Sequence, residues 1–132
     1  MTFDYSYHYR KWHNNSPEHE QAMIRYYKPL LGPWLPKDKN ARILDVGCGM
    51  GFVLSTLRDL GYGNAEGLDM DQGQVTAARE RGLNVTQSSN TEEELSMRKG
   101  IYDQILALDL LEHIPISHQI PFVHHIAEAL KP

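Results

Sequence analysis

Apolar and polar residues alternate along this chain with two periods, one typical of strands and one typical of helices. Short apolar runs predict four strands, at about residues 42–46, 65–69, 83–86 and 102–108. Strands that alternate with helices predict an α/β fold with a parallel sheet and right-handed crossovers. The expected helices lie over residues 17–31, from Val53 to Leu60, between Asp71 and Gly82, over residues 91–98, and in a final segment that carries Ile120, Val123, Ile126, Ala127 and Leu130 on one face.

Capping residues mark where these helices begin. Ser16 followed by Pro17 is a typical N-cap and first helical position. Asp71 can cap the third helix, and Thr91 with Glu94 has the spacing of a capping box for the fourth. We therefore expect the fourth helix to open at Thr91.

Size and composition limit the class of protein. The chain has 132 residues, of which 41% are hydrophobic and 23% are charged, and its formal net charge is −4. We divide it into an aromatic N-terminal segment with its helix, residues 1–40, and a sheet-forming part, residues 41–132. The negative charge gives no basic surface for nucleic acid, so we expect no nucleic-acid partner.

Membrane, disulfide and metal signals are also missing from the sequence. No apolar run approaches ~18 residues, so we expect no membrane span. The N-terminus lacks the features of a signal peptide, and the single cysteine, Cys48, cannot form an internal disulfide. A cytoplasmic location follows as the expectation. No cysteines or carboxylates lie near the histidines of the last helix with the spacing of metal ligands, so no metal site is expected.

A glycine-rich loop directly after the first strand carries the strongest chemical signal. Gly47, Gly49 and Gly51 occupy every second position, and Asp45 precedes them. The dinucleotide fingerprint has a different spacing, G-x-G-x-x-G, and a carboxylate at its mouth would repel a diphosphate. The same carboxylate suits a cofactor with a cationic end and no phosphate, such as S-adenosylmethionine. A nicotinamide or flavin site and a turn without ligand are the weaker alternatives.

Residues 45–51, which read D-V-G-C-G-M-G, resemble the first motif of the class I S-adenosylmethionine-dependent methyltransferases. The resemblance covers about residues 40–132. It implies a Rossmann-like sheet whose strand order begins 3-2-1-4, with the cofactor across the ends of strands one, two and four. It also implies that the methionine end is held by Asp45, Gly47, Cys48, Gly49 and Gly51.

The resemblance assigns further cofactor contacts beyond this loop. Asp69, at the end of the second strand, matches the acidic residue that binds the ribose hydroxyls. Met70 resembles the family's apolar residue that packs on the adenine, or it is an ordinary core residue. After the third strand the family often has an acidic residue for the adenine amino group, whereas this chain has Ser88-Ser89-Asn90. Asn90 or Ser89 would then contact the adenine edge without charge.

Residues 102–115, which contain L-D-L-L-E-H-I-P, resemble the family's fourth motif in its small-molecule branch. The resemblance places Leu108 and Asp109 at the sulfonium and Glu112 and His113 beside the transferred methyl. His113 would accept a proton from the acceptor or would simply shape the loop. Methyl transfer demands alignment above all, so a dedicated base is not required.

The two ends of the chain add two expectations. Tyr5, Tyr7, Tyr9, Arg10 and Trp12 form a lid over the cofactor or a tail on the helix of residues 17–31. The family's strands five to seven have no counterpart in this sequence, so the chain looks truncated. An open fourth strand then predicts a homodimer through the sheet edge, or cover from the aromatic tail.

The function expected from these signals is methyl transfer from S-adenosylmethionine to a small-molecule, lipid-precursor or sugar acceptor. The first alternative is a cofactor-binding module without catalysis. The second is a nicotinamide-dependent oxidoreductase, against which the glycine spacing and Asp45 count.

Overall fold

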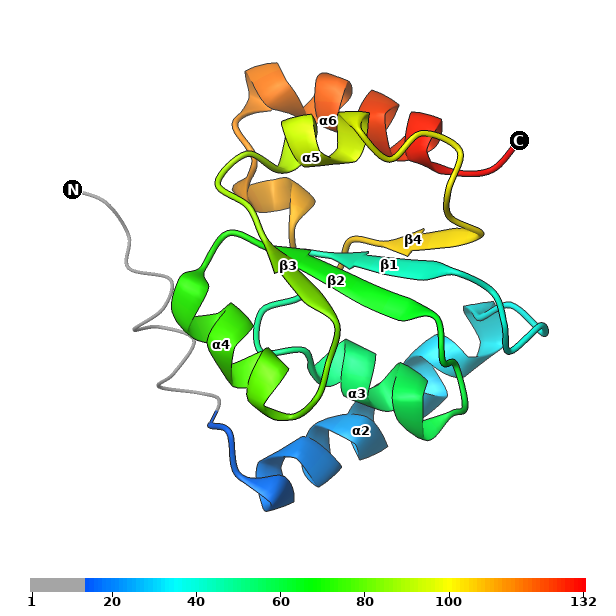
Figure 1. Ribbon diagram of the computed structural model, residues 1–132, viewed down its shortest axis with the longest axis vertical. Coiled ribbons are helices and arrows are strands. Elements are labelled where there is room, and N and C mark those ends of the chain that lie inside the picture. The colour runs from blue at the N-terminus through cyan, green and yellow to red at the C-terminus, as the bar shows by residue number, and fades with distance from the viewer. Residues whose placement is uncertain (1–13) are drawn as a thin grey trace.

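The computed structural model describes residues 14–132, which form a four-stranded parallel sheet with helices on both faces (Figure 1). The strand order β3-β2-β1-β4 confirms the predicted order 3-2-1-4. The strands are β1 (Ile43–Val46), β2 (Ala65–Asp69), β3 (Val85–Gln87) and β4 (Gln104–Leu106). The helices are α2 (Pro17–Leu31), α3 (Phe52–Asp59), α4 (Gln72–Glu80), α5 (Thr91–Ser96) and α6 (Ile116–Ala129), with short 3-10 turns η1 (Gly32–Trp34) and η2 (Leu111–His113).

Two hydrophobic clusters fill the space on either side of the sheet. Helices α2, α3 and α4 lie below the sheet in Figure 1, and α5 and α6 lie above it. Ile43 belongs to the lower cluster with Val53 and Leu57, whereas Leu44 belongs to the upper one with Phe122. All four residues of β1 are buried because this central strand has neighbours on both edges and both faces.

Helix α2 is part of the same core. Its buried residues Ile24 and Leu31 lie on one face, and Leu31 belongs to the lower cluster with Ile43. Ser16 caps the helix, because its Oγ accepts a hydrogen bond from the His19 backbone N–H at 3.1 Å. The predicted start at Pro17 is confirmed.

The fourth strand and fifth helix differ from their predicted limits. Strand β4 is shorter than residues 102–108, because Tyr102 makes an isolated bridge to Leu130 and Asp103 accepts a hydrogen bond from the Arg42 N–H at 2.7 Å. The prediction that Thr91 caps α5 was wrong. Asn90 is the cap, and its Oδ1 accepts a hydrogen bond from the Glu93 N–H at 3.1 Å.

The apolar residues of α6 do not share one environment. Phe122 and Ala129 are buried against the sheet, whereas Ile120 is 71% exposed and Val123 is 50% exposed. The prediction of a single apolar face was therefore wrong for these two positions. Helix α6 carries two apolar stripes, and the sequence pattern alone does not tell which one meets the sheet.

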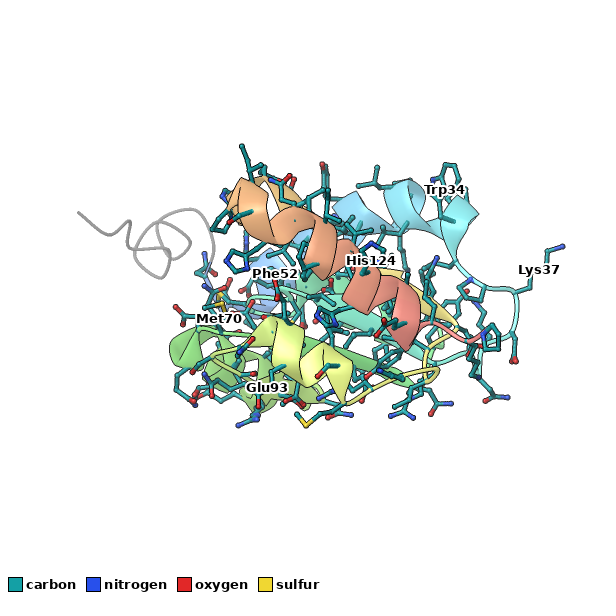
Figure 2. All side chains as sticks on the ribbon, turned by 90° about the horizontal axis from the view of Figure 1, so that it is seen from above. Trp34, Lys37, Phe52, Met70, Glu93 and His124 are labelled. Carbon is teal, nitrogen blue, oxygen red and sulfur yellow. The ribbon has the colours of Figure 1, made fainter. Side chains whose placement is uncertain are left out.

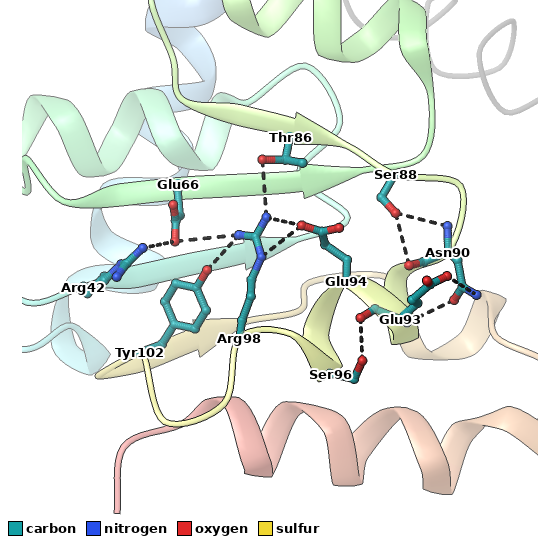
Figure 3. Close-up of polar contacts among 10 residues, drawn as sticks. All are labelled: Arg42, Glu66, Thr86, Ser88, Asn90, Glu93, Glu94, Ser96, Arg98 and Tyr102. Atoms are coloured by element: carbon teal, nitrogen blue, oxygen red, sulfur yellow. Dashed lines mark hydrogen bonds and ion pairs between the residues drawn. The ribbon is translucent and has the colours of Figure 1, made fainter.

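A partly buried ionic network holds α5 on the upper face (Figure 3). The Arg98 guanidinium donates to the Glu94 carboxylate at 2.6 Å and to the Tyr102 hydroxyl at 2.8 Å. Glu66 of β2 pairs with Arg98 at 3.8 Å and with Arg42 at 3.3 Å. Because each partly buried charge has an opposite partner, the network avoids the cost of an isolated ion.

Strand β4 has β1 as its neighbour on one side and lies at the end of the sheet order. The predicted edge-to-edge homodimer stays a prediction, which light scattering at high protein concentration tests. The helices within residues 14–132 are too short or too polar to cross a membrane.

Candidate cofactor-binding site

The loop between β1 and α3 has a backbone that glycine permits and other residues resist. Gly47, Gly49 and Gly51 have φ values of +73°, +55° and +85°. Side chains other than hydrogen are strained in this region. The Gly47 N–H donates to the Leu68 carbonyl at 2.7 Å and the Cys48 N–H to the same oxygen at 3.2 Å, which ties the loop to the end of β2.

Two of these glycines also lie in close contact with leucine side chains. A Cβ at Gly51 would lie 2.5 Å from Cδ1 of Leu83, which follows α4. A Cβ at Gly47 would lie 3.0 Å from Cδ1 of Leu110, which follows β4. The structure therefore brings the loop after β1 into contact with the loop after β4, as the expected cofactor position requires.

Gly67 is a third such position, and the sequence reasoning missed it. In the middle of β2, a Cβ at Gly67 would lie 2.6 Å from the Cys48 Sγ and 2.7 Å from the Leu54 Cδ1. The glycine loop thus rests on bare backbone of the neighbouring strand. A glycine inside a predicted strand was the available signal, because it marks close approach of another chain segment.

Asp69 joins the end of β2 to the glycine loop. Its Oδ2 accepts a hydrogen bond from the Gly49 N–H and its Oδ1 accepts one from the Asp71 N–H, both at 2.8 Å. Burial raises the pKa of Asp69, and these two N–H groups act against that shift. Each carboxylate oxygen keeps a second lone pair, so the side chain retains the capacity to accept two hydroxyl groups.

Asp45 of β1 is a buried carboxyl next to the glycine loop. It is 3% exposed. Burial raises the pKa of Asp45 to about 8, and the negative charge of Asp69 adds to the shift. An uncompensated buried carboxylate is costly, so the site favours a ligand that brings a cationic group to this position. The ammonium group of S-adenosylmethionine is such a group, so the residues present fit this cofactor.

The remaining predicted cofactor residues take three different positions. The Cys48 side chain is buried against β2, and burial raises its thiol pKa, so its side chain packs rather than reacts. Met70 is 61% exposed, which excludes the alternative of ordinary core. It lies with Phe52 toward one end of the molecule, and Lys37 lies at the other (Figure 2). Asn90 uses its Oδ1 to cap α5 and so does not turn that oxygen to a ligand.

The loop after β4 contains the residues predicted for the transfer site. Leu108 is half-buried against the lower cluster. Asp109 has a φ of +52° and is the one non-glycine residue with positive φ within residues 14–132. Such strain concentrates at functional sites. In η2, the His113 Nε2 lies 3.7 Å from the Glu112 Oε1, and both side chains are exposed.

Tyr27 of α2 is a site candidate that the sequence reasoning did not single out. It is half-buried, on the same face of α2 as Ile24 and Leu31. Burial raises its pKa, and the carboxylates of Asp45 and Asp109 add to the shift. Its hydroxyl therefore lies within electrostatic reach of the ends of both β1 and β4. A tyrosine on an otherwise aliphatic buried stripe was the signal.

Two predictions involve residues or ligands beyond this geometry. The proposed lid residues Tyr5, Tyr7, Tyr9, Arg10 and Trp12 lie outside the described residues. Within residues 14–132, no three histidine, cysteine, aspartate or glutamate side chains are grouped so that they could hold a metal ion.

Comparison with known proteins gives agreeing results. A family model described as a methyltransferase domain matches residues 12–132. A ubiquinone biosynthesis O-methyltransferase of Erwinia tasmaniensis is 32% identical over 124 residues, which are 87% of this chain and 50% of that protein. Another with this name, from Hydrogenovibrio crunogenus, is 33% identical over 71% of this chain and 40% of its own length. The chain thus spans about half the length of these relatives or less.

A solved structure shows the same fold. A methyltransferase from Archaeoglobus fulgidus, described as dependent on S-adenosylmethionine, has a TM-score of 0.71 and 23% identity, over 97% of this chain and 54% of that one. At this identity the likeness concerns the fold. The cyclase SpnF also matches, with a TM-score of 0.67 and 29% identity over 91% of this chain and 45% of its own.

Proposed function

The chain belongs to the S-adenosylmethionine-dependent methyltransferases, and we propose that the whole protein transfers a methyl group to a hydroxyl oxygen of a small-molecule acceptor. The observation that carries the proposal is the buried carboxyl of Asp45, whose pKa burial raises to about 8, directly before a glycine loop. A negative charge at this position attracts a cationic group and repels a diphosphate. The names of the matching relatives support an oxygen acceptor and a ubiquinone precursor as its class.

In this proposal, each cofactor group has a residue of the chain to hold it. Asp45 pairs with the ammonium, and the backbone of Gly47 to Gly51 lies against the methionine end. Asp69 accepts the ribose hydroxyls with its two remaining lone pairs. Exposed Met70 covers the adenine. Asn90, which caps α5, is not assigned to the adenine, and Ser89 takes its place as the neighbouring polar side chain.

In this proposal the acceptor lies beside Asp109, and residues of the chain align its oxygen with the methyl group. S-adenosylmethionine supplies an electrophilic methyl, so a carbon–oxygen bond forms as the carbon–sulfur bond breaks and the acceptor releases its proton. His113 takes that proton, and Glu112, 3.7 Å away, stabilises the imidazolium that results. The Tyr27 hydroxyl orients the acceptor oxygen. Alignment supplies most of the rate enhancement.

The first experiment is a calorimetric titration of S-adenosylhomocysteine into this chain, with NAD as the control. We expect micromolar binding of S-adenosylhomocysteine and no heat from NAD. A folded chain that binds neither compound contradicts the proposed site. The second experiment mixes the whole protein with methyl-labelled S-adenosylmethionine and a phenol. Label recovered in an aryl methyl ether supports methyl transfer to oxygen.

A cofactor-binding module without methyl transfer is the second candidate. It is favoured by the likeness to SpnF, which is named as a cyclase although it shares this fold. Binding of S-adenosylhomocysteine without label transfer to any of a panel of phenols, amines and sugars would support this candidate. The two experiments together therefore separate the two functions.

A further inference from the structure

A polar cluster joins three helices behind the glycine loop. Glu20 of α2, Ser55 of α3 and Arg81 at the end of α4 meet at one carboxylate oxygen. The Glu20 Oε2 accepts a hydrogen bond from the Ser55 Oγ at 2.8 Å and pairs with the Arg81 Nη1 at 2.7 Å. The Arg81 Nη1 also donates to the Ser55 Oγ at 3.3 Å. We call these three residues the helix brace.

The helix brace touches the end of the glycine loop directly. The Arg81 guanidinium lies over the Phe52 ring, 4.8 Å from its centroid. A Cβ on Gly51 would lie 3.5 Å from the Arg81 Nη2. The Ser55 N–H donates to the Gly51 carbonyl at 2.8 Å, so Ser55 belongs both to the brace and to the first turn of α3.

Burial makes the brace sensitive to the loss of one member. The side chains of Glu20 and Arg81 are 16% and 12% exposed. Glu20→Gln would replace the charge-assisted contacts of the Glu20 Oε2 with the Arg81 Nη1 and the Ser55 Oγ by weaker neutral hydrogen bonds. The Arg81 guanidinium would then be held less firmly against Phe52 and Gly51. Gly51, the loop residue that lies nearest to Arg81, has no side chain of its own to resist this change.

We propose that Glu20 is a positioning residue for the cofactor, acting through Arg81 and Ser55 on the shape of the glycine loop. The inference rests on the proposed function for its ligand. It gives α2 a second role besides completion of the core, because this helix then controls how well the loop fits the methionine end. Glu20 does not itself touch the cofactor.

The test compares Glu20→Gln with Glu18→Gln, an exposed acidic residue in the same first turns of α2. We expect Glu20→Gln to raise the dissociation constant of S-adenosylhomocysteine about tenfold, and Glu18→Gln to leave it within about twofold of the starting protein. Both titrations are run at a temperature where circular dichroism shows each variant to be folded. A dissociation constant of Glu20→Gln within about twofold of the starting protein would overturn the proposal.

Amide hydrogen exchange provides a readout without ligand. In Glu20→Gln, the amides of Gly51 and Ser55 should exchange faster, while the amides of β4 keep their rates, since a general loss of stability would speed both. Equal acceleration everywhere would overturn the proposal. If Glu20→Gln does not fold, Ser55→Ala replaces it, with an expected affinity loss of about threefold. Failure of the starting protein to bind S-adenosylhomocysteine counts against the proposed function. The exchange experiment still tests the helix brace in that case, because it needs no ligand.

Discussion

The loops after β1 and after β4 lie at the same end of the sheet, but they are built differently. Among residues 47–51 every position except Gly47 is buried, and backbone hydrogen bonds tie the loop to Leu68 and Asp69. In the second loop, Asp109 and the three residues of η2 are exposed. We infer that the first loop imposes one ligand geometry, whereas the second offers a surface that different acceptors can use.

The comparison predicts that the largest effects come from filling space under the first loop. Gly67→Ala would place a Cβ 2.6 Å from the Cys48 Sγ and push the loop away from β2. We expect a loss of about 2 kcal/mol in the free energy of unfolding and loss of measurable S-adenosylhomocysteine binding. Urea denaturation and calorimetry measure the two effects.

Gly63→Ala is the matched control, because nothing lies within 4 Å of a Cβ at that position. Its free energy of unfolding should stay within about 0.5 kcal/mol of the starting value. If Gly67→Ala behaves like Gly63→Ala, the close approach of Cys48 to β2 does not shape the loop.

The second effect concerns the charge buried in the first loop. Asp45→Asn should weaken S-adenosylhomocysteine binding by about 1.5–3 kcal/mol, the range for a hydrogen bond to a charged group. Since the pKa of the free carboxyl is about 8, the affinity of the starting protein should rise as the pH approaches 8. The affinity of Asp45→Asn should show no such rise. Calorimetry across this pH range measures both, and an equal rise in the variant would contradict the assignment of Asp45.

The same carboxyl predicts how stability depends on pH in the absence of ligand. The ordinary pKa of an aspartate carboxyl, 3.8, applies in the unfolded chain, and burial raises the pKa of Asp45 to about 8 in the folded protein. Between these values the folded protein binds more protons, so the free energy of unfolding decreases as the pH rises and levels off above about pH 8. Asp45→Asn should flatten this part of the curve. Denaturation at a series of pH values tests it.

A smaller effect, on the rate of methyl transfer, is expected at Tyr27 of α2. Tyr27→Phe removes the hydroxyl that we propose orients the acceptor oxygen. Methyl transfer by the whole protein should therefore slow about tenfold. Affinity for S-adenosylhomocysteine should not change. Tyr26→Phe is the control, because Tyr26 is its neighbour on α2 and is 62% exposed. Equal rates in the two variants would remove Tyr27 from the site.

The smallest effect is expected in the second loop. Glu112→Gln changes an exposed side chain, so the free energy of unfolding should stay within about 0.5 kcal/mol of the starting value. Cofactor affinity should also be unchanged, and only the rate of methyl transfer should fall. A change in S-adenosylhomocysteine affinity would show that the second loop takes part in the cofactor site after all.

The sequence predicted those features that depend on neighbouring residues. The strand limits Ala65–Asp69, the helix start at Pro17 and the glycine loop are set by local apolar runs, caps and backbone freedom. The strand order came from the family resemblance, and the structure confirms it.

Features that depend on distant packing were missed. The approach of Cys48 to Gly67, the position of Tyr27 and the pair of Glu20 with Arg81 join segments far apart in the chain. Asn90, which the family resemblance assigns to the adenine edge together with Ser89, caps α5 with its Oδ1, a role that the sequence pattern assigned to Thr91. Spacing within a helix also does not decide which of two apolar stripes on α6 meets the sheet.

The position of β1 between β2 and β4 also affects how the chain folds as it is made. The hydrogen bond from the Arg42 N–H to the Asp103 carboxylate, beside the β1–β4 pair, spans 61 residues. At translation rates of about 5–20 residues per second, roughly 3–12 s pass before β4 follows β1 out of the ribosome. During that interval one edge of the central strand has no partner. Leu110, which packs on the glycine loop, emerges later still, so the cofactor cradle takes its final shape only after the loop that follows β4 has been made.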